Sequence, residues 1–354
     1  MPTRRKLLRR FGLFGGAVIV PAAFAALRPQ SARISSPKSL PPQPLTLIPP
    51  AAAALNPHRV VVISTTDRAA GVRQAMALLQ PSSFSGKRVF IKPNYNTGDP
   101  APAATDPAVL EAVVQEIQAA GPSAITVGDR SGMASTRSAM GQMQVFSLAE
   151  RYGFTAMVFD ELGQGSWQYF PAAGTNWSRG YAIAKPVLDA DAIISLCCLK
   201  THRFGGHFTL SLKNTIGMVA RYVPGDGHDY MRELHRSGNQ RLMIAEVNQA
   251  YRPAMVLVDG VDAFVGGGPE QGQRVRAGMM LAGTDRIAVD AVGIAALRML
   301  GTTQVVSSGS IWGQAQIRRA ADLGLGAVGP EQIELVTGDA EGDRLVERIR
   351  PFLV

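Results

Sequence analysis

The sequence is poor in cysteine and in aromatic residues, and both shortages exclude classes of function. Among its 354 residues there are only two cysteines, Cys197 and Cys198, which are adjacent in the chain. Neighbouring cysteines are badly placed to pair with each other, and two thiols cannot supply the ligands of an iron–sulfur cluster. Aromatic residues make up 6% of the chain and form no cluster suited to stacking on bases. We therefore expect no iron–sulfur cluster and no nucleic-acid partner.

Acidic residues are absent from the first 25 positions, and this accounts for much of the net charge of +9. Taking the basic residues of this stretch from the total of 36 leaves 31 basic residues against 27 acidic ones. The five residues removed are Arg4, Arg5, Lys6, Arg9 and Arg10. The basic character therefore belongs mainly to the beginning of the sequence, and the remainder is only weakly cationic.

The segment Thr3-Arg4-Arg5-Lys6-Leu7-Leu8-Arg9 resembles the twin-arginine export signal, Ser/Thr-Arg-Arg-x-Phe-Leu-Lys. An apolar run over residues 11–27 follows, and Ala23-Phe24-Ala25 offers small residues to a signal peptidase. We expect a signal peptide over residues 1–25, a partnership with the twin-arginine translocase during export, and a periplasmic location. The alternative is an uncleaved segment that tethers the protein to the membrane. Eight prolines in residues 29–57 predict an extended linker over residues 26–57.

Short apolar runs alternate with helical patterns over residues 58–354, which predicts a single large α/β domain. The predicted strands are continuous rather than alternating in hydrophobicity, as parallel strands covered on both faces are. They lie at residues 60–64, 88–91, 124–127, 155–159, 192–196, 254–258 and 332–336. We expect a doubly wound, mostly parallel sheet with helices on both faces. Cys197 and Cys198 follow the buried-strand pattern, which favours core packing over a redox or metal-binding role.

Ionisable side chains follow four of the predicted strands. They occur in Lys92-Pro93-Asn94, Gly128-Asp129-Arg130, Lys200-Thr201-His202 and Asp259-Gly260. The carboxyl ends of parallel strands meet at one edge of a sheet, where ligands bind. We expect a cationic pocket for phosphate or carboxylate there, formed by Lys92, Lys200 and Lys213, with hydrogen bonds to ligand oxygens from Asn94 and Asn214.

Carboxylates and histidines near the same edge are candidate metal ligands. Asp129 and a set of three further aspartates suit a hard divalent cation, although none has the spacing of a known metal loop. The set comprises Asp259, Asp262 and Asp290. Four histidines lie within 34 residues, and zinc would accept two or three imidazoles. Of His202, His207, His228 and His235, we expect His202 in a site and interpret the other three as polar groups of loops. The consecutive glycines Gly266, Gly267 and Gly268 let a backbone approach an anionic ligand closely.

Taken in order, these motifs resemble the family catalogued as domain of unknown function 362. They include Ile91-Lys92-Pro93-Asn94, Val127-Gly128-Asp129, Lys200-Thr201-His202, Leu212-Lys213-Asn214-Thr215-Ile216-Gly217 and Ala288-Val289-Asp290-Ala291. The resemblance spans about residues 59 to 300. Many members of that family carry a ferredoxin-like segment with iron–sulfur cysteines, and this chain lacks one. The resemblance supports the site but implies no particular reaction.

Two functions are compatible with this pattern. The first is an exported enzyme that acts on a small anionic substrate, with a divalent metal or another cofactor. In that enzyme His202 carries the proton, Lys200 stabilises negative charge and Asp129 acts as base or cation ligand. The second is a non-catalytic periplasmic protein that binds a ligand, metal or cofactor at the same edge. The sequence does not predict the oligomeric state.

Overall fold

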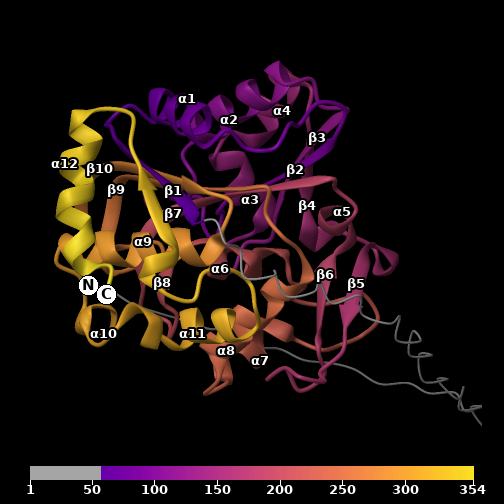
Figure 1. Ribbon diagram of the computed structural model, residues 1–354. Helices are drawn as coiled ribbons and strands as arrows, with labels where there is room; N and C mark the ends of the chain where they lie inside the picture. Colours follow the sequence, from indigo (N-terminus) through magenta and orange to yellow (C-terminus); the bar gives the residue numbers. More distant parts are fainter. Residues whose placement is uncertain (1–56) are drawn as a thin grey trace, which may run out of the picture. The chain divides into compact units, whose positions relative to one another are not determined.

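The computed structural model describes residues 57–354 and arranges them around one large sheet (Figure 1). The predicted signal peptide, and all of the predicted linker except Pro57, lie outside the described residues. The described residues fall within one compact unit, Leu40–Val354. Within residues 57–354, no helix has the length and apolar character needed to cross a membrane.

The main sheet has nine strands in the described part of the chain, with eight in the spatial order β11-β1-β10-β9-β7-β2-β3-β4 and β8 paired to β7. The strands are β1 (His58–Ser64), β2 (Arg88–Lys92), β3 (Ala124–Asp129), β4 (Thr155–Val158), β7 (Ala192–His202), β8 (His207–Thr209), β9 (Met255–Gly267), β10 (Gly272–Gly283) and β11 (Ile333–Val336). A separate two-stranded sheet pairs β5 (Trp167–Phe170) with β6 (Tyr181–Ala184).

Most neighbouring strands of the main sheet are parallel. This holds for β9 with β7, β7 with β2, β2 with β3, β3 with β4, and β1 with β11. The exceptions are β10, which is antiparallel to both β1 and β9, and β8, which folds back on β7. The predicted mostly parallel α/β sheet is confirmed, with an antiparallel strand inserted near one edge.

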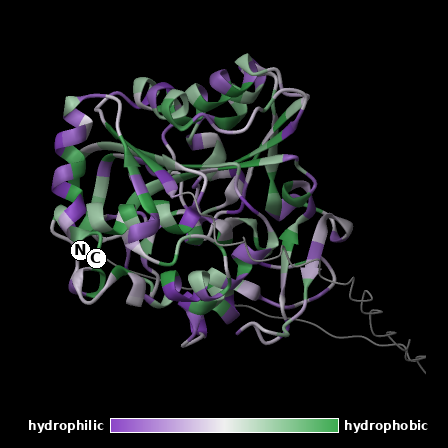
Figure 2. Ribbon diagram, viewed as in Figure 1, coloured by the Kyte–Doolittle hydropathy of each residue, from purple (hydrophilic) through white to green (hydrophobic). Residues whose placement is uncertain are grey.

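Helices cover both faces of the sheet, and each face has its own hydrophobic core. In Figure 1, α1, α2 and α4 lie above the sheet, whereas α6, α9 and α11 lie below it. The strands in the middle are mostly hydrophobic, and α12 alternates between hydrophilic and hydrophobic positions (Figure 2). The helices are α1 (Arg68–Leu79), α2 (Pro107–Ala119), α3 (Thr136–Gln142), α4 (Val145–Tyr152), α5 (Lys185–Leu188), α6 (Ser211–Asn214), α7 (Tyr230–Arg236), α8 (Gln240–Glu246), α9 (Arg286–Met299), α10 (Gln304–Ser307), α11 (Ala315–Asp322) and α12 (Ala340–Ile349).

Aspartate side chains cap the beginnings of two helices that flank the sheet. The Asp106 carboxylate accepts a hydrogen bond from the Ala108 backbone N–H over 2.9 Å, and Pro107 begins α2. The Asp285 carboxylate accepts from the Ile287 N–H over 2.7 Å and caps α9. These caps bond to N–H groups that have no partner within the helix itself.

Two strands run further than their apolar cores predict. β9 continues to Gly267 because its second half pairs with β10, with two shifts of register along the way. β7 continues to His202 because its last three residues pair with β8. Asp259, Asp262, Lys200 and His202 were expected in loops beyond the strands, and they lie instead within strands. Cross-strand pairing supplied by distant segments is not visible in the local hydrophobic pattern.

Candidate functional site

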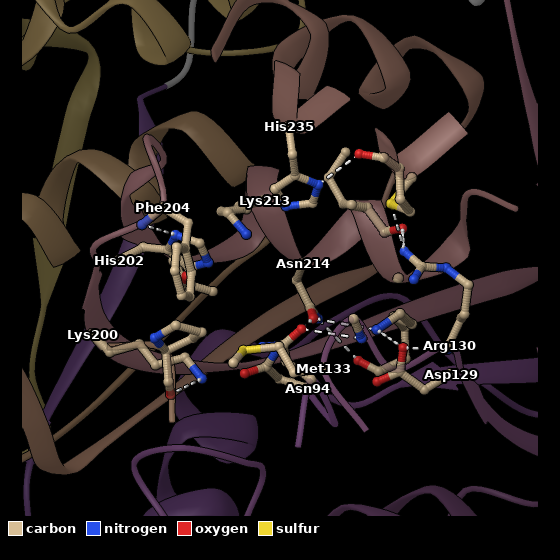
Figure 3. A pocket seen from close by; sticks show the side chains of 18 residues that line it. Asn94, Asp129, Arg130, Met133, Lys200, His202, Phe204, Lys213, Asn214 and His235 are labelled. Atoms are coloured by element: carbon tan, nitrogen blue, oxygen red, sulfur yellow. Dashed lines mark hydrogen bonds and ion pairs between the residues drawn. The ribbon is translucent and has the colours of Figure 1, made fainter. Parts of the chain in front are cut away.

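A cavity of about 70 Å³ opens at the carboxyl ends of β2, β3 and β7. It has room for roughly five water-sized groups, and hence for a small ligand. Seven of the residues predicted to form the site line it together (Figure 3). These are Lys92, Asn94, Asp129, Lys200, His202, Lys213 and Asn214. The expected convergence at one edge of the sheet is therefore present, while the chemical roles of these residues remain predictions.

Lys92 and Asp129 form a buried ion pair at the floor of the cavity. Their charged atoms lie 2.7 Å apart, and the side chains are 1% and 2% exposed. The Asp129 carboxylate also accepts the backbone N–H groups of Tyr95 and Arg130, each over 2.7 Å. Burial raises the pKa of Asp129, and the attraction of Lys92 opposes this. With both oxygens already bonded, the carboxylate is fitted to position its neighbours rather than to act as a base.

Asn214 joins the floor of the cavity to two strands. Its amide Nδ2 donates to the backbone oxygens of Lys92 and Leu196, each over 3.2 Å. Its Oδ1 accepts from Lys92 Nζ over 3.3 Å and from Asn94 Nδ2 over 3.4 Å. The buried Asn94 Oδ1 has no hydrogen-bond partner among the described residues. That oxygen is therefore available to a hydrogen-bond donor on a ligand.

Lys200 lies fully buried on β7 and donates its amine to two carbonyl oxygens. One belongs to Ala103, and the other, on Pro269, lies 3.3 Å away. Burial lowers the pKa of Lys200. A lysine ammonium has three N–H donors, so its bonds to protein oxygens leave one for a ligand.

Lys213 lies in the last turn of α6. Its amine points into the space between the labelled residues of Figure 3. No hydrogen bond or ion pair joins this amine to any other residue in the described part of the chain. Burial, followed by the charges of Lys200 and Arg130, lowers the pKa of Lys213 to about 7. The amine therefore has all of its donors unused, and its charge changes near neutral pH.

His202 is held as a neutral imidazole with a defined tautomer. Its Nδ1 accepts the Phe204 backbone N–H over 3.3 Å, so the ring proton resides on Nε2. Burial and the nearby Lys213 and Lys200 charges put the pKa of His202 well below its ordinary value. At neutral pH the ring is therefore a hydrogen-bond donor through Nε2, not a cation.

Several residues that were not assigned to the site also line the cavity. The Arg130 guanidinium donates to the backbone oxygens of Val219 over 2.8 Å and Ile216 over 2.9 Å, and its charge faces the same space. His235, interpreted from the sequence as a polar group of a loop, lies on α7 and lines the cavity. A Cβ atom at Gly217 would lie 2.7 Å from Lys92 Nζ, so glycine at this position leaves room for the ion pair.

Two large apolar side chains are among the exposed residues that line the cavity, together with His235. Met133 and Phe204 both line it and are 46% and 44% exposed. The Arg203 guanidinium lies over the Phe204 ring, 4.3 Å from its centre. A small ligand would therefore meet basic side chains inside the cavity and both apolar and polar side chains near its mouth.

The three aspartates predicted as a metal set are not brought together. Asp259 and Asp262 both bind the Arg68 side chain, over 2.7 and 2.9 Å, and Asp262 also binds Arg274. Asp290 accepts the backbone N–H groups of Ser211 and Leu212 at the start of α6. Within residues 57–354 no group of three or more His, Cys, Asp or Glu side chains is placed to hold a metal ion. The physical reason is that arginine and backbone donors already occupy these carboxylates.

The three consecutive glycines also lie elsewhere than predicted. Gly266 and Gly267 end β9, and the cavity lining includes Pro269 but none of the three glycines. Gly268, at φ +70°, packs so closely on the Thr201 carbonyl that a Cβ atom would overlap it. The Gly268 carbonyl in turn accepts the Arg203 N–H over 3.3 Å. These glycines let the β9–β10 turn approach β7, and that turn carries Pro269 to the cavity.

Cys197 and Cys198 lie within β7, 1% and 0% exposed, and do not line the cavity. Burial raises the pKa of both thiols, that of Cys198 to about 12. Such thiols remain protonated and unreactive at neutral pH. Core packing is the role that their surroundings support.

The family described as domain of unknown function (DUF362) matches residues 89–295, which is more than half of the chain. Thylakoid-associated protein sll1697 of Synechocystis sp. is 29% identical over 210 residues, covering 58% of this chain and 62% of that protein. The chain thus matches less than two thirds of the length of that relative. The lactate racemase apoprotein from Thermoanaerobacterium thermosaccharolyticum superimposes with a TM-score of 0.42 and 15% identity, over 69% of this chain and 58% of that one.

Proposed function

The chain belongs to the DUF362 family, and we propose that it is an enzyme that acts on a small anionic substrate held in the cavity at the carboxyl edge of the sheet. The observation that carries this proposal is the Lys213 amine, which faces the cavity without a hydrogen-bond partner among residues 57–354. Among the cavity-lining residues the cations are Lys92, Arg130, Lys200 and Lys213, and the single carboxylate, Asp129, is bonded to Lys92. This excess of basic side chains favours the binding of an anion from outside the protein.

Each free group has a place in binding such a substrate. Lys213 and the remaining N–H of Lys200 attract and hold the anionic group. The Nε2–H of His202 donates a hydrogen bond to an oxygen on which negative charge builds during the reaction. The unpartnered Asn94 Oδ1 accepts from a substrate hydroxyl or amine. His202 therefore stabilises charge in this proposal, and it is not the proton carrier expected from the sequence.

The cavity does not suit a divalent metal. Its lysine and arginine side chains repel a metal cation, and the aspartates expected as ligands are bonded elsewhere. We therefore assign no part of the reaction to a metal held by these residues.

A non-catalytic binding protein is the second candidate. Asp129, Lys92 and Asn214, three of the polar groups at the floor, are already bonded to protein atoms. This favours a rigid cavity that needs no group to change its bonding during a reaction. The same residues would then retain a small anion without converting it.

Turnover separates the two candidates. The full chain is incubated with a panel of small carboxylates and phosphates, and consumption is followed by NMR. For the enzyme we expect one compound to be converted, with a loss of at least about tenfold for His202→Ala, equivalent to one lost charge-stabilising hydrogen bond. His202→Gln, which keeps a donor, retains more activity. Tight retention of an anion without conversion favours the binding protein.

The proposal includes export by the twin-arginine translocase, supported by the motif at residues 3–9 and the apolar run that follows. Replacing Arg4 and Arg5 together by lysine is expected to keep the protein in the cytoplasm. The measurement is the intact mass of the protein recovered from the periplasmic and membrane fractions. A shortened periplasmic form supports cleavage, a full-length membrane-bound form supports the tether, and unchanged export of the variant contradicts the proposed route.

A further inference from the structure

We propose that Lys213 is a nucleophile whose amine forms an imine with the carbonyl carbon of a small oxo acid. This rests on the proposed function, because the carboxylate of the oxo acid is the anion that the cavity attracts. The inference names a substrate class and a covalent step for a side chain that has so far been treated only as a charge.

The first support is the position of the amine. Lys213 enters the cavity from α6 and passes close to Gly206, where a Cβ atom would lie 2.8 Å from Lys213 Cε. No acceptor in the described part of the chain bonds to the amine, so its nitrogen can turn toward a ligand. Lys92 and Lys200 differ in this respect, since both amines are bonded to carbonyl oxygens.

The second support is the set of charges that surround the amine. The other ionisable side chains lining the cavity come from four separate segments, and they are Lys92, Asp129, Arg130, Lys200, His202 and His235. Their sum is positive, because the Asp129 carboxylate is paired with Lys92 and both histidines have lowered pKa values. Neighbouring cations and burial both favour the neutral amine, which is the nucleophilic form of lysine.

The third support is the degree of this effect. The pKa of Lys213 is lowered to about 7, so the amine is neutral in roughly half of the protein molecules at neutral pH. An ordinary lysine is almost entirely protonated under the same conditions. The cavity thus combines an amine that loses its proton near neutral pH with further basic side chains that are placed to hold the carboxylate.

The chemical step needs no other reactant. The lone pair of Lys213 Nζ forms a bond to the carbonyl carbon, and the carbonyl π pair moves to oxygen. The Nε2–H of His202 is available to hydrogen-bond this oxygen as it becomes negative. The nitrogen then gives up its two protons, the oxygen departs with two protons as one water molecule, and the C=N bond forms. Nothing is oxidised or reduced.

The size and rim of the cavity limit the substrate. A volume of about 70 Å³ suits a small oxo acid such as pyruvate or glyoxylate. Met133 and Phe204 at the mouth offer apolar contact to a methyl group. We therefore expect pyruvate to be trapped more readily than a dicarboxylic oxo acid.

The test is reductive trapping on the full chain. The protein is mixed with pyruvate and sodium cyanoborohydride, and its intact mass and peptides are analysed. We expect one reduced pyruvate adduct per chain at Lys213, lost in Lys213→Arg and Lys213→Met and retained in Lys185→Met, which changes an exposed lysine. With pyruvate at saturating concentration, trapping is expected to rise as the pH increases through about 7, because the amine loses its proton.

The possible failures are distinguishable. An adduct that maps to other lysines, or one that is no more abundant than in Lys213→Arg, overturns the proposed imine. Peptide mapping of the wild type locates the adduct even if a variant does not fold. Oxalate is a dicarboxylate without a ketone or aldehyde carbonyl, so it tests the anion site alone. If oxalate binds the wild type more tightly than Lys213→Met, the proposed anion site stands without the imine. If neither oxalate nor pyruvate binds, the proposed function fails, and the imine fails with it.

Discussion

Gly206 lies directly against Lys213. A Cβ atom at Gly206 would be 2.8 Å from Lys213 Cε, 3.1 Å from its Cδ and 3.3 Å from His202 Nδ1. The lysine stem therefore occupies the space that a side chain at position 206 would fill. A residue with no functional group of its own thus fixes where the unpartnered amine lies.

This contact predicts the effect of Gly206→Ala. The added methyl group displaces the Lys213 stem, so we expect oxalate affinity to fall by about tenfold, equivalent to about 1.4 kcal/mol. The matched control is Gly163→Ala, at an exposed glycine with open space around its Cα atom. Calorimetric titration of both variants measures the difference. Equal affinities in the two variants would show that Lys213 adapts freely and that Gly206 has no positioning role.

The lowered pKa of Lys213 predicts a pH-dependent cost to stability. The unfolded chain keeps this proton up to the ordinary value of 10.5, whereas the folded protein releases it near pH 7. Between these values the unfolded state binds more protons, so rising pH increases the free energy of unfolding. The cost of burying the charged amine is therefore complete below about pH 7 and is relieved above it.

Lys213→Met, which has no proton to lose, is accordingly expected to exceed the wild type in stability most clearly below about pH 7. The margin shrinks as the pH rises toward about 10. Urea unfolding at several pH values measures it, with Lys185→Met as the control at an exposed lysine. A margin that is constant with pH, or grows with it, would mean that the folded protein holds the Lys213 proton normally.

The Lys92–Asp129 ion pair predicts a non-additive response. Lys92→Met leaves a buried carboxylate unpaired, and Asp129→Asn leaves a buried ammonium unpaired. Each is expected to lower the free energy of unfolding by roughly 3–5 kcal/mol. The double variant leaves neither charge unpaired, so its loss should be smaller than the sum of the two. Strict additivity in urea unfolding would show that the two side chains do not act as a pair.

The buried thiols predict slow chemical modification. Cys197 and Cys198 are 1% and 0% exposed, and burial raises both pKa values. We expect a maleimide reagent to label neither thiol in the folded protein and both in urea. The Cys197→Ala, Cys198→Ala double variant should keep its affinity for oxalate. Rapid labelling of the native protein, or lost binding, would restore the redox interpretation.

Much of the site follows from the sequence because parallel strands end at a common edge. Lys92, Asp129 and Lys200 are distant in the chain, yet the strand pattern alone predicts that they meet. The same reasoning cannot say which amine is free. The partner of Lys92 and the absence of a partner for Lys213 among the described residues both depend on side-chain packing and on contacts of α6. The hydrophobic pattern does not encode these contacts.

The misplaced predictions share a physical cause. Asp259 and Asp262 were assigned to a metal because aspartates after a strand suit hard cations, but Arg68 from α1 binds both. Gly268 was assigned to a ligand because consecutive glycines suit anions, but it packs on the Thr201 carbonyl. In both cases a partner from a distant segment satisfies the group. His235 was interpreted as a polar group of a loop, but it lies on α7, which brings it to the cavity.

The most direct test of the anion site is the affinity for oxalate as a function of pH, in the full chain and in Lys213→Met. Oxalate stays doubly charged near neutral pH and has no ketone or aldehyde carbonyl, so it reports binding without imine formation. We expect wild-type affinity to fall as the pH rises through about 7, where Lys213 loses its charge, and Lys213→Met to bind weakly with no such dependence. Oxalate binding of equal strength and equal pH dependence in both proteins would contradict the account.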